Sequence, residues 1–320
     1  MLAAGAALGN DEKPLNRILF GSCSKPSLDQ PLWPVILANQ PDLWIWLGDI
    51  VYADTTDMAL LRQKYDAQKT QPLYEKLRAA CPIIGVWDDH DYGENDGGRS
   101  YPKRVESQQA LLDFLDEPPG SPRRTQAGVH AAYTYGPAGK QVKVILLDER
   151  YSRDPPGAEA ELLGEEQWRW LESQLTGSTA DVHLIGSSTQ LNASEHRFDK
   201  WADYPRDRQR LLDLLARSKP RRTIVLSGDR HLGEISKLAV PGLADPLYDV
   251  TSSGMTHYAG SAAKNLWYDF KKEPNRFRIG DNFLGCNFGI ITIKWEASGP
   301  VIAMEIRDAQ NVAHCRAALP

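Results

Sequence analysis

Residues 87–96 read WDDHDYGEND and place five carboxylates, one imidazole and one carboxamide within ten positions. Residues 82–87 are apolar and rich in β-branched side chains, which predicts a buried strand. The Gly-Gly pair at 97–98 predicts a loop after the acidic stretch. A strand that ends in clustered acids places them at the carboxyl edge of a sheet, where open α/β folds bind ligands.

The acidic stretch has two interpretations. Acids this close together repel one another unless water or a bound cation neutralises them. A cation would also use the neighbouring imidazole, whereas a solvated surface loop would need neither metal nor histidine. Further polar strand ends along the chain favour the cation.

The composition is that of an ordinary globular protein, because 42% of the 320 residues are hydrophobic and 25% are charged. The net charge of -5 gives no indication of nucleic-acid binding, sequence-specific or otherwise. The spacing of the four cysteines matches no zinc or redox motif, and it leaves disulfide pairing open. The oligomeric state is open as well.

The first nine residues, MLAAGAALG, are small and apolar. They are similar to the end of a secretory signal with its cleavage zone, although the basic start of such a signal is missing. We therefore expect residues 1–13 to be a leader remnant or a disordered terminus, and residues 14–320 to form a single catalytic domain. This interpretation favours a secreted or periplasmic protein over a cytoplasmic one. Elsewhere the chain has no transmembrane candidate.

Strands and helices alternate in the first part of the chain. Predicted strands at 16–20, 43–47 and 82–87 are separated by helical segments, which indicates parallel βαβ units. Late in the chain, predicted strands follow one another without helices, which indicates a second, mixed or antiparallel sheet. These late strands are predicted at 235–240, 248–252, 289–296 and 301–307.

Five predicted strands end in residues that can bind metals, and in a parallel sheet such ends share one edge. The residues are Cys23, Asp49 with Tyr52, Asp88 to His90, Asp148 to Arg150, and Asp229 with His231. Thiolate and phenolate suit iron or zinc, whereas a site of carboxylates and carboxamides suits calcium, magnesium or manganese. Both sets are present, so two unlike metals are predicted. Taken singly, each residue also has an ordinary structural explanation, such as a packed thiol for Cys23.

The order of the motifs resembles one known family. The motifs GSCS, GDIVY, WDDHDYGEND, LLDERYSR, GSSTQ and SGDRH follow one another between residues 21 and 231. This order resembles the alkaline phosphatase D (PhoD-like) branch of the calcineurin-like metallophosphatases. The resemblance implies an α/β fold, described as a four-layer αββα sandwich with two central mixed sheets, and a metal centre at the strand ends.

The resemblance implies an iron half of this centre. The superfamily begins with a metal-binding Asp-x-His, but this chain has Cys23 there, as the alkaline phosphatase D branch does. Asp49 matches the aspartate that bridges two metals. Tyr52 matches the tyrosine that binds ferric iron in this branch and in purple acid phosphatases.

The resemblance also implies an oxygen-rich half that suits calcium. Asp89 stands where most of the superfamily has a metal-binding asparagine, although a shift of one residue would put Asp88 there. Asn95 matches an asparagine near the calcium end. Asp229 replaces the first histidine of the last motif, and His231 keeps the second. The implied cofactors are Fe³⁺ and Ca²⁺, with Zn²⁺, Mn²⁺ and Mg²⁺ as alternatives.

The resemblance assigns the remaining roles to substrate contacts. His90 matches the histidine that contacts the phosphate or the leaving group, and Arg150 and Arg230 are expected to bind phosphate. We therefore expect a phosphoester substrate, a monoester or a diester, attacked by a metal-bound hydroxide. The alternatives are a phospholipase D-like phosphodiesterase of the same fold and a non-catalytic calcium-binding module. The pocket walls are expected at residues 118–130, 152–164 and 258–282.

Overall fold

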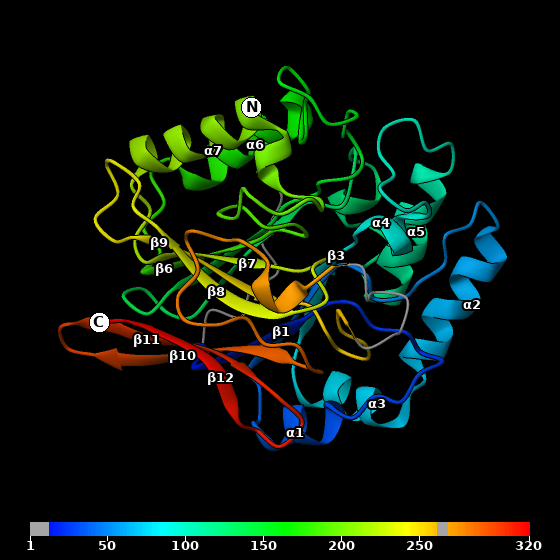
Figure 1. Cartoon of the computed structure of the whole chain (residues 1–320), viewed down its shortest axis with the longest axis horizontal. Helices are drawn as coiled ribbons and strands as arrows, with labels where there is room; N and C mark the ends of the chain where they lie inside the picture. Colours follow the sequence, from blue (N-terminus) through cyan, green and yellow to red (C-terminus); the bar gives the residue numbers. More distant parts are fainter. Residues whose placement is uncertain (1–12, 261–267) are drawn as a thin grey trace.

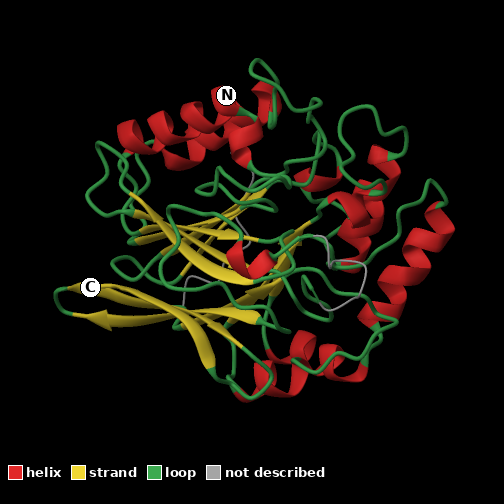
Figure 2. Cartoon of the chain, in the orientation of Figure 1, coloured by secondary structure: helices red, strands yellow, loops and turns green. Residues whose placement is uncertain are grey.

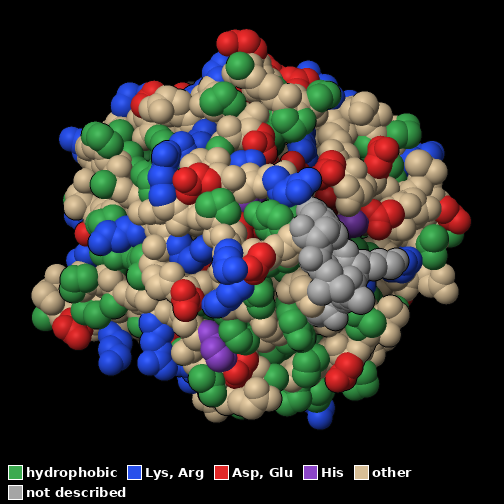
Figure 3. Space-filling view, in the orientation of Figure 1, with side chains coloured by type: hydrophobic (Ala, Val, Ile, Leu, Met, Phe, Trp, Pro, Cys, Tyr) green, Lys and Arg blue, Asp and Glu red, His purple; other side chains and the backbone are tan. Residues whose placement is uncertain are grey.

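A computed structural model of the chain describes residues 13–260 and 268–320. The expected leader remnant at 1–13 therefore lies outside the described residues, apart from Lys13. Within the described ranges, no helix is both long and apolar enough to cross a membrane. On the face drawn in Figure 3, basic and acidic side chains are interspersed.

Two six-stranded mixed sheets lie at the centre of the molecule (Figures 1 and 2). The first sheet has the order β12-β11-β10-β1-β2-β3, in which β1, β2 and β3 are parallel and the other neighbours are antiparallel. Its strands are β1 (Arg17–Gly21), β2 (Leu43–Leu47), β3 (Ile83–Val86), β10 (Phe288–Glu296), β11 (Gly299–Arg307) and β12 (Ala313–Leu319).

The second sheet has the order β4-β5-β6-β7-β9-β8, with parallel pairing from β5 to β9 and antiparallel pairing at both edges. Its strands are β4 (Ala131–Tyr135), β5 (Val142–Leu146), β6 (Val182–Gly186), β7 (Thr223–Ser227), β8 (Gly233–Leu238) and β9 (Leu247–Ser252). The two sheets contact each other through β10 and β11 against β9, and through β12 against β8.

Helices cover the outer faces of the two sheets, so the predicted four-layer αββα sandwich is confirmed (Figure 2). Helices α6 and α7 pack on the second sheet, and α1 and α3 lie below the first, with α2, α4 and α5 to one side (Figure 1). The helices are α1 (Trp33–Ala38), α2 (Met58–Lys69), α3 (Pro72–Ala80), α4 (Asp89–Tyr92), α5 (Arg104–Phe114), α6 (Gly164–Leu175) and α7 (Pro205–Ser218). Short 3-10 turns are η1 (Pro122–Arg124), η2 (Trp201–Asp203) and η4 (Phe270–Lys272).

Hydrophobic burial explains why the central strands are continuous apolar runs. Strand β2 is LWIWL, and all five side chains are buried because both faces of the sheet are covered. Trp44 and Trp46 pack edge to face at 5.3 Å between ring centroids, and Trp33 of α1 packs on both.

The late strands agree with the sequence prediction in part, because β8 and β9 lie in the second, mixed sheet as expected. Strands β10 and β11 do not start a new sheet, because β10 pairs with β1 and so completes the first sheet. Strand β12 was not predicted, because its sequence AHCRAAL lacks β-branched residues and favours a helix. The strand-end residues that the sequence singles out come from both sheets, because Cys23, Asp49 and Asp89 follow strands of the first sheet and His231 follows β7 of the second.

The turn after β2 tolerates only glycine at position 48. Gly48 has φ +87°, and a Cβ atom there would lie 2.3 Å from the Cβ of Asp88. The turn can therefore carry Asp49 toward the chain that follows β3 only if residue 48 has no side chain.

We predict that Gly48→Ala destabilises the protein by about 1–3 kcal/mol through overpacking, with about 1–2 kcal/mol more from the left-handed backbone. Chemical denaturation measures the free energy of unfolding. Gly120→Ala is the control, because a Cβ there meets no atom within 4 Å, and it should change stability little. Equal stability of the two variants would contradict this account of the turn.

Candidate metal centre

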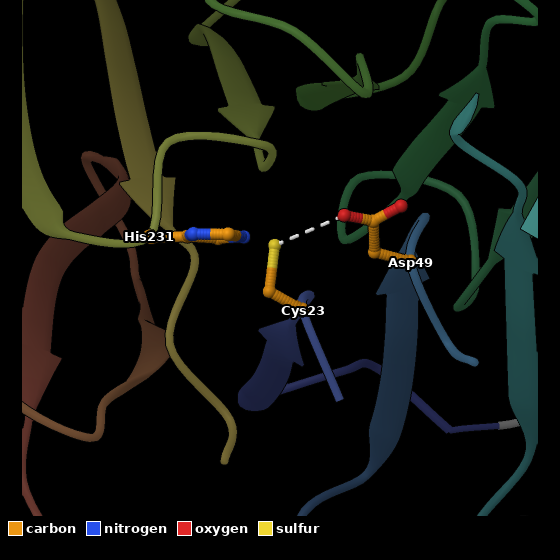
Figure 4. A group of neighbouring side chains, drawn as sticks. All are labelled: Cys23, Asp49 and His231. Atoms are coloured by element: carbon orange, nitrogen blue, oxygen red, sulfur yellow. Dashed lines mark hydrogen bonds between the residues drawn. The ribbon is translucent and has the colours of Figure 1, made fainter. Parts of the chain in front are cut away.

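Three side chains from both sheets form the first donor group (Figure 4). Cys23 follows β1, Asp49 follows β2, and His231 follows β7 of the second sheet. Their ligand atoms all lie within 4.8 Å of one another, and the Cys23 thiol donates a hydrogen bond of 3.3 Å to Asp49 Oδ2. We call these three residues the Cys23 group.

Tyr52 adds a phenol to the Cys23 group. Its hydroxyl donates to Asp49 Oδ2 at 3.0 Å and lies 2.9 Å from His231 Nε2. A second imidazole also approaches the phenol, since His257 Nε2 lies 3.1 Å from the same hydroxyl. Thiol, carboxylate, phenol and imidazole therefore converge on one point.

Asp49 also belongs to a second donor group with Asp89 and His90, which we call the Asp89 group. Both new residues start helix α4, directly after β3. The His90 backbone N–H donates to Asp89 Oδ1 at 2.9 Å and to Asp49 Oδ1 at 3.4 Å, which holds the two carboxylates side by side. Asp49 is thus the residue that the two groups share.

The electrostatics of the Cys23 group fit a bound cation. Burial, followed by the charge of Asp49, raises the pKa of the Cys23 thiol well above its ordinary value. Burial and the neighbouring Asp89 likewise raise the pKa of Asp49 well above its ordinary value. Anions that repel one another in a buried site gain stability from a cation between them, which shifts these groups to their metal-binding form.

Two further donors are already in a form that binds metal. Burial, His257 and Arg230 hold the pKa of His231 well below its ordinary value, so its imidazole is neutral at physiological pH. Burial raises the pKa of Asp89, but Arg150, His90 and two backbone N–H groups outweigh it, so the net pKa lies below the ordinary value.

Strained backbone conformations are found around the two donor groups. Left-handed φ angles are found at Cys23 (61°), Asp49 (51°), Asp54 (45°), Asp229 (65°) and His231 (53°). Each such non-glycine residue costs about 1–3 kcal/mol, and strain of this kind concentrates where function requires a particular geometry. The strand ends here turn sharply so that their side chains point at one centre.

The five carboxylates of residues 87–96 have different roles in the structure. Asp91 accepts three backbone N–H bonds, from Asp49, Ile50 and Asp88, and so ties the loop after β2 to the start of α4. Glu94 and Asp96 are exposed and line the pocket described below. This leaves Asp88 and Asp89 as the two candidates for the second metal.

The structure distinguishes Asp88 from Asp89. Asp88 is fully buried and accepts a 2.6 Å hydrogen bond from Arg150 Nε, while Arg150 also pairs with Asp199 at 3.1 Å. Asp89 lies in a donor group instead. Arg150 is itself fully buried and does not line the pocket, so the structure places it as an ion-pair partner rather than on the pocket surface.

A pocket of ≈ 810 Å³ opens beside the two donor groups. It is lined by Asp89, His90, Asn95, Asp229, Arg230 and His231, among others. Asn95 is exposed and donates to Asp96 Oδ2 at 2.8 Å, and Asp229 lies outside both donor groups found in the described chain. Arg230 is 3% exposed and donates to both oxygens of Glu273 at 2.7 Å.

The walls of the pocket agree only in part with the sequence expectation. The predicted loops at 152–164 and 258–282 contribute, through Arg153 to Pro156 and through Ala259 and Phe270. The predicted loop at 118–130 does not line the pocket. Other residues line it instead, and they form no recognisable sequence motif: Arg197, Phe198, Asp199 and Asp203.

Asp54 was not predicted from the sequence. Its Oδ1 lies 2.6 Å from His90 Nδ1. Burial lowers the pKa of His90, but this hydrogen bond and the charges of Asp49 and Asp89 outweigh it and raise the pKa to about 9. Asp54 follows GDIVY by two positions, so its closeness to that motif is the sequence signal that could have identified it.

Lys25 and His257 were not among the site residues predicted from the sequence either. Lys25 Nζ lies 4.2 Å from the centroid of the Tyr52 ring, and His257 lies beside the ring of His231, with 4.6 Å between the centroids. Neither residue belongs to a strand-end motif of its own, and their place beside Tyr52 depends on long-range folding.

Two packed mixed sheets with metal donors at their strand ends define a protein of the metallophosphatase fold. The sequence pattern of the PhoD-like phosphatases matches residues 20–257, and the chain therefore belongs to the PhoD-like phosphatase family. Alkaline phosphatase D of Bacillus subtilis (strain 168) is 25% identical over an alignment of 213 positions, which covers 56% of this chain and 36% of that protein. This chain thus aligns with little more than a third of that relative.

Solved structures support the fold. The structure of PhoD has a TM-score of 0.72 at 18% identity and covers 98% of this chain and 73% of its own. GAP50, described as the anchor in the inner membrane complex of Plasmodium, has a TM-score of 0.62 at 13% identity, with coverage of 96% and 89%. A dimetal phosphatase from Danio rerio has a TM-score of 0.50 at 13% identity, with coverage of 96% and 99%.

We predict that Arg150→Met destabilises the protein by about 3–5 kcal/mol, because it leaves Asp88 buried without its counter-charge. Adding Asp88→Asn should recover part of this loss. Arg210→Met is the control, because its pair with Glu165 is exposed and should contribute less than about 1 kcal/mol. Denaturation curves that show no difference between Arg150→Met and the control would disprove the buried ion pair.

Proposed function

We propose that the chain is a metal-dependent phosphoesterase that hydrolyses phosphomonoesters, phosphodiesters or both. The observation that carries this proposal is that two donor groups share the carboxylate of Asp49 beside a pocket. Two cations that share one ligand are suited to hold a phosphoryl group between them. Family membership supports hydrolysis of phosphate esters, while the substrate itself is part of the proposal.

The donor chemistry supports two different metals. Cys23 and His231, with the phenol of Tyr52, would hold a transition metal, for which we propose Fe³⁺. Asp89, with the shared Asp49 and oxygen donors such as Asn95 and Asp229 from the same pocket, would hold Ca²⁺. Zn²⁺, Mn²⁺ and Mg²⁺ are the alternatives. When bound, these cations act as Lewis acids on the phosphoryl oxygens and lower the pKa of water towards neutrality.

We propose that His90 is the general acid for the departing alcohol. Asp54 accepts the Nδ1 proton of His90, which leaves Nε2 as the nitrogen that can serve the pocket. The ring of Tyr52 packs against the imidazole at 4.1 Å between centroids and restricts its rotation. Arg150 then acts as a positioning residue, because its pair with Asp88 fixes the chain just before Asp89 and His90.

We further propose that residues 14–320 form one catalytic domain and that the protein is secreted or periplasmic. The location is supported by the small apolar residues at positions 1–9. Cell fractionation tests it directly.

We predict that protein reconstituted with iron and calcium contains about one iron per chain and hydrolyses p-nitrophenyl phosphate or bis-p-nitrophenyl phosphate. Elemental analysis and hydrolysis rates measure both properties, and the preferred ester separates a monoesterase from a diesterase.

A ferric–tyrosinate centre absorbs visible light, so Tyr52→Phe should remove the absorption band. Colourless protein that cleaves neither ester would favour the calcium-binding module instead.

We predict that His90→Ala lowers kcat by about 10²–10⁴-fold for phenyl phosphate esters, and less for p-nitrophenyl esters, because p-nitrophenolate leaves without a proton. Asp54→Asn should act in the same direction with a smaller effect. The His314–Asp308 pair has a similar separation of 2.7 Å and lies outside the pocket, so His314→Ala is the matched control. The metal content of His90→Ala must equal that of the wild-type protein. A loss of metal in this variant would indicate that the His90 imidazole is a metal ligand rather than the general acid.

A further inference from the structure

Three aromatic rings from two separate loops pack together at the pocket. Phe198 and Phe270 both line it, and their rings are stacked at 5.6 Å between centroids with an interplanar angle of 20°. Tyr268 packs edge to face against both, at 5.5 Å from Phe198 and 4.9 Å from Phe270. We call these three residues the aromatic wall.

The aromatic wall is fixed to the metal centre through one arginine. The Cζ of Arg230 lies 4.2 Å from the centroid of the Phe198 ring, and Arg230 is the residue between Asp229 and His231. Its guanidinium binds both carboxylate oxygens of Glu273, which directly follows η4, the turn that carries Phe270. This turn is the orange helix in front of the sheets in Figure 1. One buried ion pair therefore links His231, Phe198 and Phe270.

The charge of Arg230 is already neutralised in this arrangement. The side chains of Arg230 and Glu273 are 3% and 1% exposed, and Arg230 Nη2 donates to both carboxylate oxygens of Glu273. Arg230 therefore supports the Phe198 ring more than it offers a free positive charge to an anion. This part of the pocket is suited to an apolar ring rather than to a second phosphate.

We propose that the aromatic wall is a binding subsite for a flat aromatic group carried by the alcohol part of the substrate. This inference rests on the proposed function and adds the substrate class to it. A phosphoryl group held at the donor groups lies next to His231, and its ester substituent enters the same pocket as Phe198 and Phe270. The pocket of ≈ 810 Å³ has room for such a group, and Pro155 and Pro156 add apolar surface to its lining.

Phosphonates that cannot be hydrolysed test the subsite without a leaving group. Binding of methylphosphonate and phenylphosphonate to the metal-loaded protein is measured by calorimetry. We expect phenylphosphonate to bind about tenfold more tightly, because its ring packs on Phe198 and Phe270. In Phe198→Ala this ratio should fall to about twofold or less, while the affinity for methylphosphonate stays the same.

The matched control is Phe277→Ala. Phe277 is half-buried like Phe198 and has Arg276 at 4.9 Å from its ring centroid, but it does not line the pocket. The control should keep the wild-type ratio. Phe198→Leu keeps most of the apolar volume and shows whether lost binding comes from the missing ring or from misfolding, with the melting temperature as a check.

The outcomes separate this inference from the function on which it rests. Equal affinity of the wild-type protein for both phosphonates, or an unchanged ratio in Phe198→Ala, overturns the aromatic subsite and leaves the phosphoesterase proposal standing. Failure of the metal-loaded protein to bind either phosphonate overturns both.

Discussion

The structure depends on keeping the Asp49 carboxylate buried among other acids. It accepts bonds from Cys23 and Tyr52 and lies beside Asp89, in surroundings that strongly favour its protonated form. A protein rarely accepts such a cost without a compensating charge. The left-handed turns at the strand ends, the glycine at position 48 and the three backbone bonds to Asp91 all hold this carboxylate in place.

The sequence predicted the donor residues of the site better than the residues that surround them. Cys23, Asp49, Tyr52 and His231 could be found because each follows a short apolar strand, and the carboxyl ends of parallel strands are where such residues meet. The strand pattern could not show that the ends belong to two sheets, since strand pairing is a long-range property. It also could not show that Arg150 is buried against Asp88, or that Phe198 and Phe270, from separate loops, lie together.

Fold alone does not establish catalysis in this group of proteins. The chain is similar in structure to PhoD and also to GAP50, whose structure is described as an anchor in a membrane complex. The distinction therefore depends on particular side chains, because one fold supports different functions. A convergent set of thiol, phenol, imidazole and shared carboxylate has no evident use in a scaffold. This set of side chains, more than the fold, supports the proposal that the chain is a phosphoesterase.

The Cys23 group joins residues that follow β1 and β2 of one sheet to a residue that follows β7 of the other. A cation held by this group would cross-link the two halves of the sandwich, as a disulfide does in other proteins. Binding to the folded state alone adds a stability of RT ln(1 + [M]/Kd), where [M] is the free metal concentration. The supply of metal would then set how long the folded protein persists, as well as how fast it works.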